Sequence, residues 1–188
     1  GLGRCTSLQT LELSRCEKLA YVCGLGGCQK LQTLNLSIRM GDVADLSRCA
    51  RLHRLELTDC TWFIGLSALV KCASLRILHI SGCLRDMQFS VFEHHSLEEL
   101  KIMDCDGLRS VAGLGQCASL HTLDIINCDR LADVGSLGRC TSLRTLKISE
   151  CSRLTDVAGL GRCTSLQTLK ISKCHWLTNV GGVGGCQN

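Results

Sequence analysis

A single motif recurs at an almost constant interval along the whole chain. The pattern Leu-x-x-Leu-x-(Leu/Ile) begins eight times, at Leu8, Leu31, Leu52, Leu75, Leu97, Leu120, Leu143 and Leu166. The successive steps are 23, 21, 23, 22, 23, 23 and 23 residues. A fixed period of this size indicates a stacked repeat architecture, in which each unit buries its apolar face only against its neighbours. We therefore expect residues 1–188 to form a single solenoid of about eight repeats, each 21–23 residues long.

Each repeat divides into a strand and a return limb. In the copy Leu143–Ser165, Leu146 and Ile148 alternate with polar residues, the two-residue period of a strand with one buried face. After Cys151 the apolar residues come at every third position and glycines interrupt them, which predicts tight turns or a 3₁₀ segment. One repeat then makes one coil, and the stacked coils give a parallel sheet on the order of 40 Å long.

The repeated blocks also carry a family resemblance. Leu120–Cys128 and Leu166–Cys174 resemble leucine-rich repeats of the type with cysteine where asparagine is commoner. The return limb LTDVAGLGRCTSL is similar to internalin-type repeats and to trypanosomatid repeats, some of which are described as adenylate cyclase regulators. The resemblance implies the α/β class: a right-handed solenoid with a parallel sheet on its concave face and short turns or 3₁₀ segments on its convex face. It also implies protein binding on the concave strand face, without identifying the partner.

The 16 cysteines fall almost entirely into two columns of the repeat. The strand-end column, eight residues after the first leucine, is Cys16, Cys60, Cys83, Cys105, Cys128, Cys151 and Cys174. The return-limb column, three residues before the next first leucine, is Cys5, Cys28, Cys49, Cys72, Cys117, Cys140, Cys163 and Cys186. Only Cys23 lies outside both. Zinc ligands come as close pairs, so this spacing favours buried, reduced thiols that pack as small apolar groups.

Reduced thiols predict an intracellular, cytoplasmic protein, because disulfides are rare there. Disulfides between neighbouring coils stay open as an alternative, since stacked strands approach closely enough to be bridged. An extracellular or cell-surface location stays open with them.

Signals of catalysis, cofactor binding and metal binding are lacking. The glycines form no phosphate-binding loop, and the histidines show no metal-site spacing; His94 takes a place in the return-limb column that cysteine fills elsewhere. Buried cysteines are poor nucleophiles. We expect no enzymatic activity, no cofactor and no metal. The net charge of +4 is dispersed and no apolar run is long enough for a membrane span, so we expect neither nucleic acid binding nor a membrane span.

Three outward positions of each strand can be compared between copies. The first column is Thr10, Thr33, Arg54, Ile77, Glu99, Thr122, Thr145 and Thr168; the second is Glu12, Asn35, Glu56, His79, Lys101, Asp124, Lys147 and Lys170; the third is Ser14, Ser37, Thr58, Ser81, Met103, Ile126, Ser149 and Ser172. Threonine and serine dominate the outer two columns, and the third to sixth copies depart from them.

The departing residues mix apolar and charged side chains, as protein-binding patches do. We predict that they form the partner-binding site: Arg54, Glu56, Ile77, His79, Glu99, Lys101, Met103 and Ile126. Repeat drift without selection is the alternative explanation.

The function that these features favour is a protein–protein interaction scaffold with a regulatory or targeting role. A surface or secreted adhesion module and the substrate-receptor arm of a ubiquitin ligase are the alternatives. The chain opens in a return limb and stops where another strand should begin, so we expect it to be a fragment of a longer protein. Its oligomeric state is open, and uncapped ends would allow end-to-end stacking.

Overall fold

The eight leucine motifs form one continuous parallel sheet. The computed structural model describes residues 2–16, 22, 24–37, 40–59, 62–64, 66–84, 87–89 and 92–182. The strands of the main sheet are β1 Thr10–Leu13, β2 Thr33–Ser37, β4 Arg54–Thr58, β6 Ile77–Ser81, β8 Glu99–Met103, β10 Thr122–Ile126, β11 Thr145–Ser149 and β12 Thr168–Ser172. They pair in that order. Equivalent residues are partners, as the fixed period predicts, for example Thr122 with Thr145 and Thr145 with Thr168.

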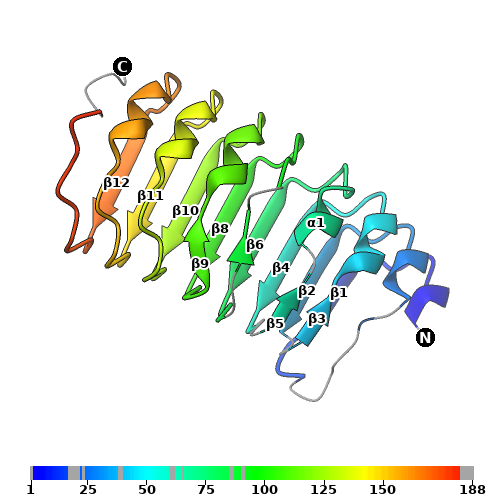
Figure 1. Ribbon diagram of the computed structural model, residues 1–188. Helices are drawn as coiled ribbons and strands as arrows, with labels where there is room; N and C mark the ends of the chain where they lie inside the picture. Colours follow the sequence, from blue (N-terminus) through cyan, green and yellow to red (C-terminus); the bar gives the residue numbers. More distant parts are fainter. Residues whose placement is uncertain are drawn as a thin grey trace.

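The return limbs run back alongside the main sheet to a row of short helices (Figure 1). Most are the predicted 3₁₀ turns: η1 Leu2–Arg4, η2 Leu25–Gly27, η3 Ala44–Arg48, η4 Ala112–Gln116, η5 Gly135–Arg139 and η6 Ala158–Arg162; the third coil has instead the four-residue α-helix α1, Leu66–Leu69. No helix in the described residues is long and apolar enough to cross a membrane. The α/β solenoid with 3₁₀ return limbs is therefore confirmed.

Two small sheets accompany the irregular coils. In the 21-residue second repeat, β3 (Met40–Asp42) pairs with β5 (Trp62–Ile64) of the next return limb. In the 22-residue fourth repeat, β7 (Met87–Gln88) pairs with β9 (Leu108–Ser110). The shortened limbs are thus held to their neighbours by extra backbone pairing.

The core lies between the main sheet and the return limbs. The inward residues of the strands, such as Leu146 and Leu123, are fully buried, and so are the return-limb residues Leu154 and Val157. Outward strand residues are mostly half-buried, the alternation expected of a strand with one solvated face. No coil encloses its own core, so stability depends on contacts between neighbouring coils.

Most strands of the main sheet are followed by a left-handed residue. The residues are Arg15, Asp59, Gly82, Asp104, Asn127, Glu150 and Lys173, with φ between 50° and 71°. Gly, Asn and Asp adopt this conformation readily, whereas Glu150 and Lys173 do so at a cost of about 1–2 kcal/mol. The left-handed residue directly precedes the strand-end cysteine, and it turns the chain out of the sheet into the return limb.

The 13 cysteines that the structure describes are free thiols, most of them buried. Five of the strand-end column donate to the carbonyl two residues earlier, as Cys105 Sγ does to Met103 O at 3.1 Å. Six of the return-limb column donate to a carbonyl of the preceding coil, as Cys140 Sγ does to Leu114 O at 3.0 Å. Burial raises the pKa of Cys140 to about 12. The buried thiols pack as core residues, and those of the return-limb column also tie neighbouring coils together by hydrogen bonds.

Among the cysteines that the structure describes, incomplete burial occurs only at the two ends of the solenoid. Cys5 is exposed, and Cys16 and Cys174 are half-buried. The prediction of buried thiols therefore holds for the interior coils, where both neighbours are present, and is wrong for the described cysteines of the outermost coils.

His94 replaces cysteine in the return-limb column and is buried, with 1% of its surface exposed. Its ring lies 5.7 Å from that of Phe92, and neither ring nitrogen makes a well-formed hydrogen bond to a described residue. Burial lowers the pKa of His94 below its ordinary value of 6.5, although backbone groups of Leu69 and Cys72 oppose this shift. The imidazole is thus held in its neutral form.

Folding stability should therefore fall in mild acid. The unfolded chain binds a proton at His94 more readily than the folded chain, so this contribution is complete above about pH 6.5 and is lost as the pH falls toward the lower folded pKa. His94→Cys restores the column residue and should flatten this part of the pH profile. Urea unfolding of both proteins between about pH 7.5 and pH 5 measures the difference. The exposed His95→Cys is the control, and equal slopes for all three proteins would contradict the prediction.

Candidate protein interface on the strand face

The predicted site residues lie together on the outward side of four adjacent strands. Arg54 and Glu56 are on β4, Ile77 and His79 on β6, Glu99, Lys101 and Met103 on β8, and Ile126 on β10. The register makes neighbours of Arg54, Ile77 and Glu99, of Glu56, His79 and Lys101, and of Met103 and Ile126. All eight are half-buried. We call these eight residues the strand-face patch.

Four residues of the patch form one polar cluster centred on His79. Its Nε2 lies 2.8 Å from Glu99 Oε1, and its Nδ1 lies 3.3 Å from Glu56 Oε1. Arg54 pairs with the same oxygen of Glu56. Arg54 Nη2 also lies 3.5 Å from His79 Nδ1, so Arg54 and Glu56 both approach the same ring nitrogen. The cluster connects β4, β6 and β8 and holds its side chains in place before any partner arrives.

A shallow hollow opens beside this cluster. It is lined by four residues of the strand-face patch and by four of their neighbours on β4 and β6. The patch residues are Glu56, His79, Lys101 and Met103, and the neighbours are Leu57, Thr58, Ile80 and Ser81. Thr58 and Ser81 come from the third outward column, where their small side chains leave space next to the larger Met103. The sequence analysis did not select Thr58 and Ser81 because serine and threonine are the commonest residues of that column. The signal that could have found them is the difference in size between Ser81 and its neighbour Met103.

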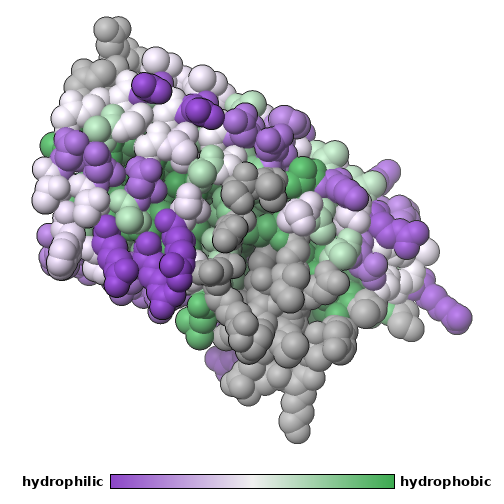
Figure 2. Space-filling model, viewed as in Figure 1, coloured by the Kyte–Doolittle hydropathy of each residue, from purple (hydrophilic) through white to green (hydrophobic). Residues whose placement is uncertain are grey.

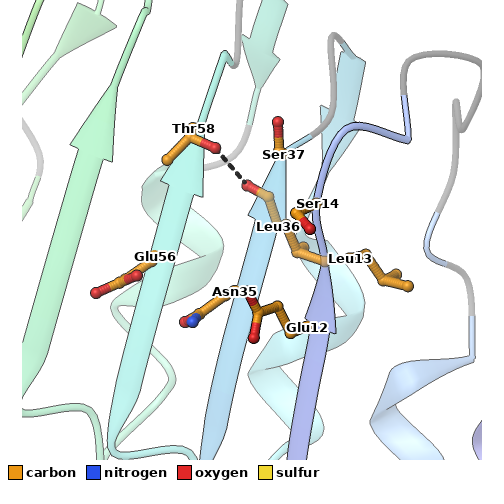
Figure 3. Close-up of a pocket in the computed structure, with 8 residues that line it drawn as sticks. All are labelled: Glu12, Leu13, Ser14, Asn35, Leu36, Ser37, Glu56 and Thr58. Carbon is orange, nitrogen blue, oxygen red and sulfur yellow. Dashed lines mark hydrogen bonds between the residues drawn. The ribbon is translucent and has the colours of Figure 1, made fainter.

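A second hollow extends the site toward β1, beyond the predicted residues. Figure 3 shows Glu12, Asn35 and Glu56 side by side on three neighbouring strands, with Thr58 donating to the carbonyl of Leu36 at 3.5 Å. Asn35 Oδ1 is buried and accepts no hydrogen bond from a described residue. Glu12 and the unpaired oxygen of Asn35, next to a Glu56 carboxylate that Arg54 already engages, make this end of the face rich in hydrogen-bond acceptors. It is suited to a positively charged donor.

The other end of the strand face is basic. Lys101, Lys147 and Lys170 follow one another in the central column, interrupted by Asp124. Lys147 Nζ lies 3.6 Å from Asp124 Oδ2, and Asp124 Oδ1 is buried without a described partner. The face therefore changes from acidic at β1 to predominantly basic at β12.

Comparisons with known proteins agree with this architecture. A family model described as Leucine Rich repeat matches residues 162–184. No curated protein matches the chain by sequence. Among solved structures, the leucine-rich-repeat domain of the type III effector XopL is similar with 19% identity and a TM-score of 0.83, covering 98% of this chain and 68% of that one.

Two internalins of Listeria monocytogenes are similar as well. Internalin C2 has 17% identity and a TM-score of 0.72, covering 97% of this chain and 79% of that one. Internalin F has 17% identity and a TM-score of 0.57, covering 99% of this chain, which spans only 61% of that protein. At these identities the likeness shows the fold.

Proposed function

We propose that this chain, a leucine-rich-repeat protein by its motif and its fold, binds a protein partner on the strand face, centred on the strand-face patch. Solenoids of this kind commonly use their extended strand surface for protein–protein interaction. The observation that carries the proposal is that the half-buried Ile77, Met103 and Ile126 lie beside the polar cluster centred on His79.

The composition of the patch supports a protein partner. The half-buried Ile77, Met103 and Ile126 offer apolar area, and the cluster around His79 supplies fixed charges beside them. Protein interfaces combine an apolar centre with a polar surround in this way. Because the charged side chains are already tied to one another, their ordering costs less on binding.

The charge gradient along the face restricts the partner further. A partner segment with basic groups over Glu12 and Glu56 and acidic groups over Lys147 and Lys170 would be complementary over the length of the sheet. Such complementarity fixes orientation and suppresses reversed binding. We expect a bipolar segment for this reason.

The thiol hydrogen bonds support the proposal of a reducing, intracellular compartment. Cys72 Sγ donates to Leu46 O at 3.2 Å and Cys163 Sγ to Leu137 O at 3.0 Å, both across neighbouring coils. Oxidation to disulfides would remove these donors. The adhesion and ubiquitin-ligase alternatives have no comparable observation in their favour.

Partner capture with matched variants tests the proposed function. The double variant Ile77→Ala/Met103→Ala should weaken retention of the partner at least about tenfold, because it truncates the apolar centre of the patch. The control is Thr145→Ala/Thr168→Ala, two outward residues of the default type on β11 and β12. Isotope-labelled affinity capture from the cells of origin compares both with the unmodified chain. A partner that every variant retains equally would contradict the assignment of the patch.

A further inference from the structure

Three arginines from consecutive coils line one cavity, at the edge of the solenoid where the strands turn into the return limbs. The lining residues are Arg109, Arg130, Arg153 and Ala132. All three arginines are exposed. Figure 2, seen from the same side as Figure 1, shows strongly hydrophilic side chains gathered along this edge. We call the three arginines the arginine edge; they are separate from the strand-face patch.

The repeat register explains how the cavity forms. Arg130 and Arg153 are equivalent, each two residues after the strand-end cysteine of its coil. In the preceding coil this position is Gly107, which has no side chain, and the arginine comes two residues later as Arg109. Arg109 is equivalent to the small Ala132. The shift brings a third guanidinium to a place that the stacked pair alone would not fill.

Two carboxylates close in sequence to Arg130 are already engaged by other groups. Asp129 Oδ1 accepts a hydrogen bond of 2.6 Å from Ser152 Oγ, and Asp133 Oδ1 accepts one of 2.7 Å from a backbone N–H two residues on. Arg130 makes no hydrogen bond or ion pair with any residue that the structure describes. Arg153 has Asp129 as a charged neighbour. Arg109 also has an interaction partner. Arg130 is the arginine of the edge whose charge is left for a ligand, and Arg109 and Arg153 can add further N–H donors.

Some charges stacked between coils are paired with the opposite sign. Lys173 Nζ lies 2.7 Å from Glu150 Oε1, and Arg76 Nη1 lies 3.2 Å from Glu98 Oε1. Arg130 and Arg153 stack like on like, as Lys147 and Lys170 do on the strand face, in coils about 4.8 Å apart. Their mutual repulsion falls when an anion sits between them. Guanidinium groups suit this role because their planar N–H forks match the oxygens of phosphate and carboxylate.

We propose that the arginine edge is a binding site for a phosphate-type oxyanion. A doubly charged group with three or four oxygens can receive N–H donors from three guanidiniums at once, whereas a single carboxylate has two oxygens and one charge. Free phosphate and a phosphate carried on a partner's side chain share this chemistry. This proposed site does not depend on the strand-face patch. The two proposals can therefore be disproved independently of each other.

Isothermal titration of the chain at fixed ionic strength tests the proposal, with two probes: inorganic phosphate and capped phosphoserine. The unmodified chain should bind saturably, and Arg130→Ala/Arg153→Ala should weaken binding at least about tenfold. The matched control is Arg139→Ala/Arg162→Ala, which removes the same charge from two exposed arginines at the ends of η5 and η6. All the substituted side chains are exposed, so the variants should keep the unfolding midpoint of the parent.

The outcomes are distinct. Tighter binding of phosphoserine than of inorganic phosphate supports the site and identifies a partner-borne phosphate; the reverse order supports the site and identifies a free anion. Absence of saturable binding by both probes overturns the proposal. Equal weakening by the two double variants also overturns it, because net charge alone would then account for the binding.

Discussion

Gly159→Ala is expected to lower the free energy of unfolding by about 1–3 kcal/mol. Gly159 lies in η6 against η5 of the preceding coil, and an added Cβ would be 2.6 Å from Gly135 O and closer still to Gly135 Cα. Both atoms belong to the backbone, so no side chain can rotate away. Relief requires the two return limbs to separate, which opens the core beneath them. Urea denaturation measures the loss as a shift in midpoint.

The control for this prediction is Gly135→Ala. An added Cβ there would meet only side-chain atoms of Asp133, the nearest at 3.1 Å. Ala112 and Ala158 already occupy the same position in neighbouring coils. Gly135→Ala should therefore cost much less than Gly159→Ala. If the Gly159 variant proves as stable as the Gly135 variant, the result would contradict the close approach of the two return-limb backbones.

Leu146→Ala is expected to have the largest effect on stability, about 2–5 kcal/mol. Leu146 is fully buried at the second position of β11, between Leu123 and Leu169 of the neighbouring strands. Its truncation leaves a cavity that each neighbouring coil also borders. Since coils are stable only through their neighbours, the unfolding transition should also become less cooperative. Thermal and urea unfolding followed by circular dichroism measure both effects.

The adjacent Lys147→Ala is the matched control for the core variant. Lys147 is exposed on the opposite side of the same strand, and its contact with Asp124 spans 3.6 Å. A surface ion pair of this kind contributes about 0–1 kcal/mol. Similar losses for the two variants would contradict the assignment of the inward and outward sides of β11.

The constant period of the sequence was enough to predict much of this fold. Residues one period apart must stack, so the register of Thr122, Thr145 and Thr168 follows from counting alone. The same counting placed the eight patch residues on one face and both cysteine columns in the interior. Spacing by three in the return limb predicted the 3₁₀ turns.

Features without a period could not be predicted in this way. The left-handed position before the strand-end cysteine is filled by residues as different as Asn127, Glu150 and Lys173, so no residue type signals it. The pairing of β3 with β5 depends on how the shortened return limb of the second repeat packs against the return limb of the third. The arginine edge arises from a two-residue displacement of Arg109, visible only once the coils are stacked.

The polar contacts of the site were beyond sequence reasoning for another reason. Column positions place Glu56, His79 and Glu99 near one another, but rotamers decide which atoms meet. That His79 lies between two carboxylates, and that Asn35 keeps an unpaired oxygen, emerges only from the side-chain geometry.

Hydroxyl-radical footprinting of the chain with its captured partner tests the central claim most directly. Met103 lies half-buried in the strand-face patch and its thioether is readily oxidised, whereas Trp176 is 69% exposed and lies away from the patch, after β12. If the partner binds the patch, oxidation of Met103 falls severalfold on complex formation while that of Trp176 is unchanged. Unchanged oxidation of Met103, with protection elsewhere on the solenoid, would contradict binding on the strand face.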